Sequence, residues 1–236
     1  MSPSLIGPAV GSGSSSPRCR PGATPYPFAV DVERAIADCR RLGTDMLRIG
    51  MAPMSELRTE DTVVDYAKRT EKAPQSLAGE DITLCYDNHH VEFAKINGTF
   101  ILDILAEEAQ SMGREIDVHW VQRGGLDPVR TLQKYADRTA MVHLKDYRIG
   151  ALSEDGVEAY DANPWNETFM AHFLGVVQFA ELGEGNLDFA SIVPTAMDAG
   201  AKYLLVEQDR LYGRTVFEAP ATSHRNLVAL GFKDLF

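Results

Sequence analysis

Four short apolar runs along the chain each end in acidic or imidazole side chains. Each run together with the polar residues that end it spans 82–89, 116–120, 141–146 or 203–209. Runs of this length, rich in β-branched and other apolar residues, predict buried strands. We therefore predict strands at 82–87, 116–120, 141–146 and 203–208, together with strands at 46–49 and 176–181.

Segments with helical spacing of apolar residues lie between the predicted strands. The predicted helices span 31–42, 61–72, 100–112, 128–136, 188–199 and 223–230. Gly43 is expected to be the C-cap of the first helix, and Pro74 is expected to end the second. Asp127 and Pro128 are an N-cap acid followed by proline at the first helical position. Residues 147–176 are predicted to be a long connection without regular structure, a feature that is often functional.

The order of these elements predicts the fold class. Strands that alternate with helices are typical of βαβ units and a parallel sheet. Polar groups at the carboxyl ends of the strands favour a (β/α) barrel of the TIM type, because its sites lie on that face. A doubly wound sheet is the alternative, but no Gly-rich turn follows an early strand. Residues 1–28 are rich in Ser, Gly and Pro and predict a flexible leader, so the barrel domain is assigned to 29–236.

Composition limits the partners and the compartment. The net charge of −11 argues against a nucleic-acid partner and gives no support for an anionic membrane. No run of eighteen apolar residues is present, so no membrane span is expected. The three cysteines are irregularly spaced and predict neither a disulfide framework nor a zinc knuckle. No secretory apolar segment is found at the N-terminus, and we expect a cytoplasmic protein.

Alternation along the strands predicts which polar groups share a face. Residues two apart in a strand point to the same side. The expected pairs are Asp87 with His89, Asp117 with His119, His143 with Lys145, and Glu207 with Asp209. Each strand therefore offers two polar groups to the centre of the barrel.

Three carboxylates and one imidazole in this set predict a metal site. The proposed ligands are Asp87, Asp117, His143 and Glu207. A mostly hard oxygen set suits Mn²⁺ best, with Mg²⁺, Co²⁺ or Zn²⁺ as alternatives. A metal with open positions can bind adjacent oxygens of a polyol and acidify the C–H bond between them. His89, His119 and Lys145 are the candidates for proton transfer, whereas Glu92 is interpreted as a solvated loop charge.

The same residues resemble a known family. Leu84-Cys85-Tyr86-Asp87-Asn88-His89, followed by Glu92-Phe93, resembles the Leu-Cys-Tyr-His-Asn-His-x-x-Glu-Phe segment of the sugar phosphate isomerase/epimerase group of xylose isomerase-like barrels. Later blocks at 116–120, 143–146, 181–185 and 206–209 resemble that group in the same order. The likeness covers about residues 30 to 233. It implies that Asp117, His143 and Glu207 are metal ligands, that Asp87 replaces a Glu or His ligand, and that His89 acts in proton transfer.

The resemblance implies an enzyme of carbohydrate metabolism that acts on a small sugar or cyclitol. An isomerase or epimerase is the first hypothesis, with His89, Glu207 and Lys145 as catalytic residues. The predicted substrate-binding residues are His119, Lys145, Glu184 and Asp209. The alternatives are a lyase or dehydratase acting on a 3-keto-glycoside or inosose, and a catalytically silent truncated relative. A related endonuclease is disfavoured by the net charge of −11.

The barrel is expected to be incomplete at its N-terminus. Only about five to six of the eight strands are recognised, because the leader occupies the place of the first βα units of the family. Closure removes the edges of a sheet, so an open barrel leaves edges exposed at 46–49 and 203–208. We therefore expect a homo-oligomer or a partner chain that covers these edges.

Overall fold

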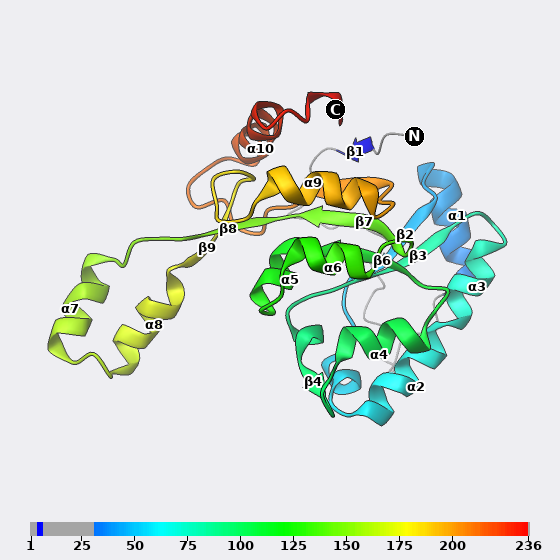
Figure 1. Ribbon diagram of the computed structural model, residues 1–236, viewed down its shortest axis with the longest axis horizontal. Coiled ribbons are helices and arrows are strands. Elements are labelled where there is room, and N and C mark those ends of the chain that lie inside the picture. Colours follow the sequence, from blue (N-terminus) through cyan, green and yellow to red (C-terminus); the bar gives the residue numbers. More distant parts are fainter. Residues whose placement is uncertain (1–3, 7–30, 236) are drawn as a thin grey trace.

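A curled parallel sheet of six strands forms the centre of the molecule (Figure 1). The computed structural model describes residues 4–6 and 31–235. The strand order is β1-β10-β7-β6-β3-β2. These strands are β1 (Ser4–Ile6), β2 (Met46–Ile49), β3 (Thr83–Asp87), β6 (Gly113–Asp117), β7 (Thr139–Leu144) and β10 (Tyr203–Val206). The predicted fold class, an incomplete (β/α) barrel, is confirmed.

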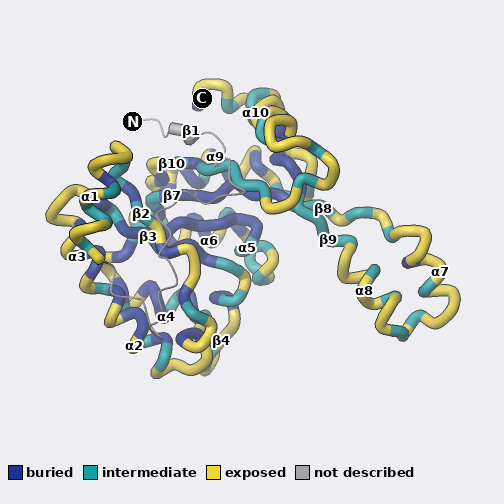
Figure 2. Tube along the Cα trace, turned by 180° about the vertical axis from the view of Figure 1, so that it is seen from behind, coloured by how far each residue is buried: buried dark blue, intermediate teal, exposed yellow. Residues whose placement is uncertain are grey.

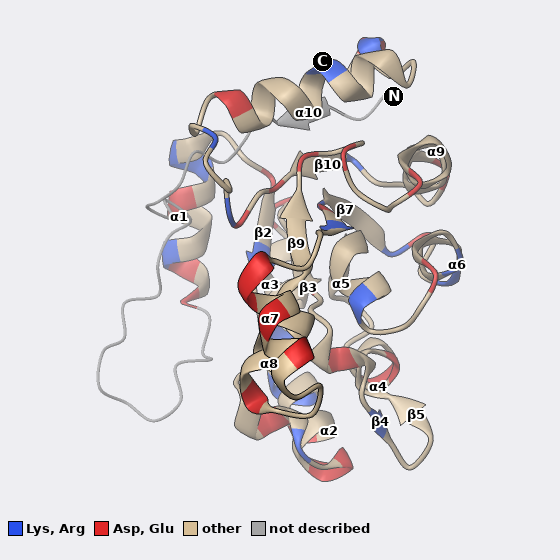
Figure 3. Ribbon diagram, turned by 90° about the vertical axis from the view of Figure 1, so that its left-hand side faces the viewer, with Lys and Arg blue, Asp and Glu red and all other residues tan. Residues whose placement is uncertain are grey.

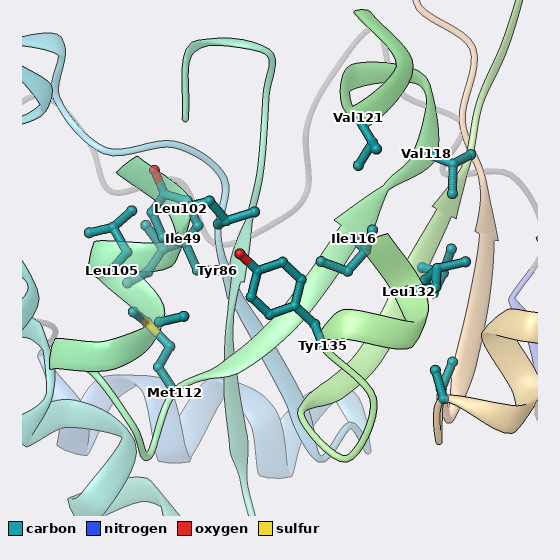
Figure 4. Close-up of a cluster of buried hydrophobic side chains, with 14 of the residues drawn as sticks. Ile49, Tyr86, Leu102, Leu105, Met112, Ile116, Val118, Val121, Leu132 and Tyr135 are labelled. Atoms are coloured by element: carbon teal, nitrogen blue, oxygen red, sulfur yellow. The ribbon is translucent and has the colours of Figure 1, made fainter. Parts of the chain in front are cut away.

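Helices cover the outer face of the curled sheet. They are α1 (Val32–Leu42), α2 (Glu60–Thr70), α3 (Lys72–Ala78), α4 (Ile101–Glu108), α5 (Val118–Arg123), α6 (Pro128–Lys134), α9 (Phe189–Asp198) and α10 (Glu218–Ala229). Alternate strand residues such as Ile49, Tyr86 and Ile116 pack beneath these helices in the main core (Figure 4). Among the described residues, the helices are all too short or too polar to cross a membrane.

The inner face of the sheet has a smaller apolar cluster. Met46, Cys85 and Met141 are buried there, each two residues before a charged or imidazole residue of its strand. The period of two along a strand thus separates an apolar lower layer from a polar upper layer. That upper layer is where the predicted site lies.

Helix ends follow the predicted capping chemistry. Asp31 accepts a hydrogen bond from the backbone N–H of Arg34, and Gly43 ends α1 in the left-handed conformation. Asp127 accepts from the N–H of Arg130 at the start of α6. Pro74 does not end a helix, contrary to the prediction. It lies in the first turn of α3, where its missing N–H costs nothing because that donor has no partner within the helix.

The edge of the sheet at β10 is not open, so that part of the prediction was wrong. β1 pairs in parallel with β10, with Ser4 opposite Tyr203 and Ile6 opposite Leu205. The expected leader at 1–28 otherwise lies outside the described residues. At the other edge, β2 pairs only with β3 among the strands that the structure describes.

A projecting arm replaces the irregular connection predicted at 147–176. β8 (Asp146–Ile149) and β9 (Val177–Ala180) form an antiparallel ribbon, which confirms the short strand predicted near 176–181. The ribbon carries α7 (Glu154–Ala162) and α8 (Glu167–Gly175) away from the barrel (Figure 2). Acidic residues are frequent along α7 (Figure 3). These helices were missed because they pack mainly on each other and show little of the spacing of a core-facing helix.

Candidate metal centre

The carboxyl ends of β3 and β6 are joined by the buried side chain of Asn88. Its amide nitrogen donates to the carbonyl of Asp117 at 3.3 Å, and its oxygen accepts from the Asp117 N–H at 3.2 Å. One oxygen of Asp117 accepts from the N–H of Trp120 at 3.1 Å and so caps α5. These bonds hold Asp87, the neighbour of Asn88, and Asp117 at the same end of the sheet.

Three of the predicted ligands converge on one point. Ligand atoms of the buried residues Asp87, Asp117 and His143 lie within 4.8 Å of one another. Nδ1 of His143 is 3.6 Å from Oδ1 of Asp87 and 3.6 Å from Oδ2 of Asp117. Oε2 of Glu207, the fourth predicted ligand, lies 3.5 Å from the same nitrogen. The four groups predicted from four separate strand ends are therefore brought together.

The donor set fits a divalent cation. Nδ1 of His143 and Oδ1 of Asp87 are buried and have no hydrogen-bond partner among the described residues. Unpaired buried polar atoms are costly, and a cation bound between them would remove that cost. Separations of 3.5 to 3.6 Å between ligand atoms are compatible with a shared ion at about 2 Å from each.

Carboxylates outnumber permanent cations in this cluster. The acids are Asp87, Glu115, Asp117, Glu207 and Asp209, and the permanent cations in contact with them are Arg48 and Lys145. Five negative and two positive groups leave an excess of negative charge whether or not His143 is protonated. This excess attracts a cation.

Lys145 lies within the carboxylate cluster, as the alternation with His143 predicted. Its Nζ is 2.8 Å from Glu207, 3.3 Å from Asp117 and 3.1 Å from Asp209. Burial opposes the charge, but the attraction of Asp117 and Glu207 outweighs burial and raises the pKa of Lys145. An ammonium held in this way can donate hydrogen bonds and stabilise negative charge, and it is a poor base.

His119 does not lie on the strand with Asp117, so alternation along a strand does not place it, and its predicted role in substrate binding stays a prediction. The strand ends at Asp117, and His119 lies in the first turn of α5. Its buried ring packs against Trp120, Tyr147 and Phe179, with centroid distances of 4.6, 5.3 and 4.9 Å. Burial lowers the pKa of His119 to about 4, so the ring is neutral at physiological pH.

His89 is positioned by a buried network that includes Glu92. Glu92 is fully buried and accepts from the N–H of His89 at 2.8 Å and from the hydroxyl of Tyr86 at 2.6 Å. The interpretation of Glu92 as a solvated loop charge was therefore wrong. The ring of His89 lies 5.5 Å from that of Trp120. Burial lowers the pKa of His89, so its ring is neutral and can accept a proton.

Glu184 is placed on a separate loop. Asp146, fully buried, holds this loop through the N–H groups of Gly183, Gly185 and Leu187 at 3.0 to 3.2 Å. The carboxylate of Glu184 pairs with Arg214 at 2.7 and 3.1 Å rather than with the Asp87, Asp117 and His143 group. Its predicted role in substrate binding stays a prediction.

Two residues behind the His143 ring were not predicted from the sequence. Oε1 of Glu115 lies 2.9 Å and Nη1 of Arg48 lies 3.1 Å from Nε2 of His143. Arg48 also donates to Oδ2 of Asp87 at 3.1 Å. Glu115 lies two residues before Asp117, and Arg48 lies two residues after Met46. Because Asp117 and Met46 face inward, alternation along the strands places Glu115 and Arg48 on the same face.

The fold defines the architectural class of the protein. Solved structures with the same fold include xylose isomerase domain proteins. A sugar phosphate isomerase/epimerase from Parabacteroides distasonis has a TM-score of 0.64 at 20% identity, over 85% of this chain and 63% of that chain. The chain thus spans less than two thirds of that relative. The architecture is that of a xylose isomerase-like TIM barrel of which part is present.

Two further solved structures share this fold. A probable 3-DHS dehydratase from Bacillus anthracis has a TM-score of 0.55 at 16% identity, over 85% of this chain and 72% of that chain. The IOLI protein, solved with a zinc atom, has a TM-score of 0.55 at 14% identity, over 87% of this chain and 69% of that chain. At these identities the likeness establishes the fold alone. No protein-family model matches the sequence, and no curated protein matches it.

Proposed function

We propose that the chain is a divalent-metal enzyme that moves a proton next to the carbonyl of a sugar or keto-sugar, as an isomerase or epimerase. The convergence of Asp117, Asp87 and Glu207 on Nδ1 of His143, at 3.5 to 3.6 Å, carries this proposal. A divalent ion held there, with Mn²⁺ the best suited, would polarise the carbonyl and acidify the adjacent C–H bond.

The residues around the ion have separate roles in this proposal. Burial alone would raise the pKa of Glu207, but His143 and Lys145 lower it, so Glu207 stays a carboxylate that can accept a proton. His89, with its neutral ring, is the second proton acceptor. Lys145, beside Asp209, is placed to donate a hydrogen bond to a substrate oxygen as negative charge develops on it.

A lyase or dehydratase is the second candidate. It would begin with the same proton abstraction and then lose a β-hydroxyl or aglycone from a 3-keto-glycoside or inosose. The dehydratase among the structures with this fold favours this alternative. A catalytically silent relative is the third candidate, and the chain spans 63% of the length of the Parabacteroides protein.

Metal analysis combined with solvent deuterium incorporation tests these candidates. The purified chain is incubated in D₂O with ketohexoses, 3-keto-glycosides and inososes after its metal content has been measured. Deuterium in the sugar without loss of water or aglycone supports the isomerase or epimerase. Loss of water or aglycone supports the lyase. A protein that neither binds metal nor exchanges deuterium contradicts both and supports the silent alternative.

Metal affinity is expected to fall as the pH falls. Burial raises the pKa of Asp87. Burial opposes protonation of His143, but the negative charge of Glu115 and the other acids raises its pKa well above the usual value. A proton on either residue must leave before the ion binds, so each costs about tenfold in affinity per pH unit below its raised pKa. Calorimetric titration between about pH 8 and pH 5.5 measures this slope, and a flat profile would contradict it.

The open edge of β2 leads to a proposal about assembly. Its backbone groups on the side away from β3 pair with no strand of the described chain, and such edges associate readily. We expect the chain to form a homo-oligomer or to need a partner chain in the cytoplasm. Light scattering measures the mass directly, and a monodisperse, metal-loaded monomer would argue against this expectation.

A further inference from the structure

The hairpin formed by α7 and α8 leaves a broad apolar surface uncovered. Six of the fourteen large hydrophobic side chains that are exposed in the described residues lie within 154–175, a segment of 22 residues. Trp165, in the turn between the two helices, is 86% exposed. All residues of α8 are at least partly exposed, and Gly156 is the only buried residue of α7. Apolar patches of this kind mark interaction sites on soluble proteins.

The exposed apolar residues of the two helices share one side of the hairpin. Met170 and Phe173 are three residues apart on α8, and Val157 and Tyr160 are three residues apart on α7, so each pair forms a stripe along its helix. The helices lie side by side (Figure 1). At 3.6 residues per turn, both stripes turn to the same side of the antiparallel pair. These four residues form the hairpin face, with Trp165 at one of its ends.

The charges of the hairpin lie away from this face. Residues 149–177 contain five acids and no Lys or Arg, so they carry −5 of the net charge of −11. Four of the acids are on α7, where the helical repeat places them opposite Gly156, the residue that lies against His172 of α8. The fifth, Glu167, is in the first turn of α8. A partner that binds by charge would therefore contact the outer side of α7, whereas the hairpin face requires an apolar partner.

The hairpin is too small to be stable through its own packing. Each of its helices has nine residues, fewer than the roughly 12 to 15 that an isolated helix needs in water. The two helices pack mainly on each other and project away from the barrel (Figure 2). The chain outside 149–177 has a net charge of −6, so electrostatics do not favour docking of the acidic hairpin on the barrel of a second copy. An identical hairpin, turned face to face, keeps the acids of both copies on the outside.

We propose that the hairpin face is a contact between two copies of this chain, in which two α7–α8 hairpins form a four-helix bundle around a two-fold axis. Antiparallel helices joined by short loops are the units from which such bundles are built. A two-fold contact presents the same surface of each copy to the other, which suits a face that is apolar throughout. The contact is separate from the metal centre and from the open edge of β2.

The area of this contact is that of a weak but specific dimer. Fully covered aromatic side chains bury about 150–250 Å² each, so the exposed parts of Tyr160, Trp165 and Phe173 amount to about 400 Å² per copy. Two copies therefore cover about 800 Å² through these rings, and the aliphatic residues bring the total close to the ~1,200 Å² of the smaller stable interfaces. We expect a dimer that dissociates in the micromolar range.

Sedimentation equilibrium of the full chain between about 1 and 100 µM tests the proposal. Val157→Glu places a carboxylate on the hairpin face, where dimerisation would bury it without a partner, so the dissociation constant is expected to rise at least about 100-fold. Val216→Glu is the matched control. Val216 is 47% exposed, as Val157 is, but it lies in the loop between β10 and α10, so this variant should dimerise like the parent. A parent that stays monomeric, or equal dissociation constants for the parent and Val157→Glu, would overturn the proposal.

The fluorescence of Trp165 gives a second measurement. The chain has two tryptophans, so Trp120→Phe leaves Trp165 as the only one. Its emission should shift to shorter wavelength, and its quenching by acrylamide should weaken, as the concentration rises through the dissociation constant. Adding Val157→Glu should abolish both changes, while an unchanged circular dichroism spectrum shows that the helices persist. A dimer with a fully accessible Trp165 would place the contact elsewhere, and a monomer with a protected Trp165 would mean that the same chain covers the face. Either result rejects the proposal.

Discussion

Replacing Asp117 with asparagine is expected to weaken metal binding strongly while leaving the fold intact. Asparagine keeps an oxygen that can accept from the N–H of Trp120, so the cap of α5 survives. The variant loses the negative charge at Oδ2, the atom 3.6 Å from Nδ1 of His143 and 3.3 Å from Nζ of Lys145. Changes to outer-shell partners already cost 10- to 100-fold, so loss of a ligand charge should weaken Mn²⁺ binding by more than about 100-fold.

A second N-cap aspartate is the control for this substitution. Asp127 caps α6 through the N–H of Arg130 in the same way, but none of its bonds reaches the proposed ligands. Asp127→Asn should leave the Mn²⁺ affinity unchanged, and calorimetry on the three proteins gives the comparison. Parent-like affinity in Asp117→Asn would remove Asp117 from the ligand set and with it the proposed chemistry.

Replacing Asp146 with alanine is expected to give the largest loss of stability. Its carboxylate accepts from four backbone N–H groups, those of Tyr147, Gly183, Gly185 and Leu187, at 2.8 to 3.2 Å. Hydrogen bonds to charged groups contribute about 1.5–3 kcal/mol each, but part of the loop can regain water. We therefore expect the free energy of unfolding to fall by about 3–5 kcal/mol, as measured by urea denaturation.

Asp188 provides the control for this substitution. Comparing the two variants separates the loss of stability specific to Asp146 from the loss caused by removing any acid near this loop. It is the N-cap of α9, bonded to the N–H of Ser191, so Asp188→Ala should cost only about 1 kcal/mol. Gly185 is a second probe, because a Cβ there would lie 2.3 Å from Oδ1 of Asp146. If Asp146→Ala lowers the free energy of unfolding no more than Asp188→Ala does, the hydrogen bonds of Asp146 do not hold the loop.

The sequence alone was enough to predict β2, β3, β7 and β10 and to propose the ligands, whereas β6 lies three residues earlier than the strand predicted at 116–120. Buried strands have an apolar run and a period of two, both of which are local properties. A polar residue at the end of such a run, such as Asp87 or His143, is visible without knowledge of its neighbours. Caps such as Asp31 and Asp127 are local in the same sense, because their partners lie three residues away.

Other features depended on where each strand ends and on what packs across it. His119 belongs to α5 and not to β6, because Asp117 caps a helix that begins directly after the strand. The pattern of alternation does not show where a strand ends. The pairing of β1 with β10 joins segments about 200 residues apart, and no local signal specifies such a pairing.

Glu115 and Arg48 show the same division between what local sequence specifies and what tertiary structure decides. That Glu115 and Arg48 face inward follows from strand alternation. Their meeting at Nε2 of His143 is a property of the curled sheet, because curvature brings the inner faces of β2, β6 and β7 toward one point. Local sequence therefore determined which residues could form the site, and the curvature of the sheet decided which of them touch.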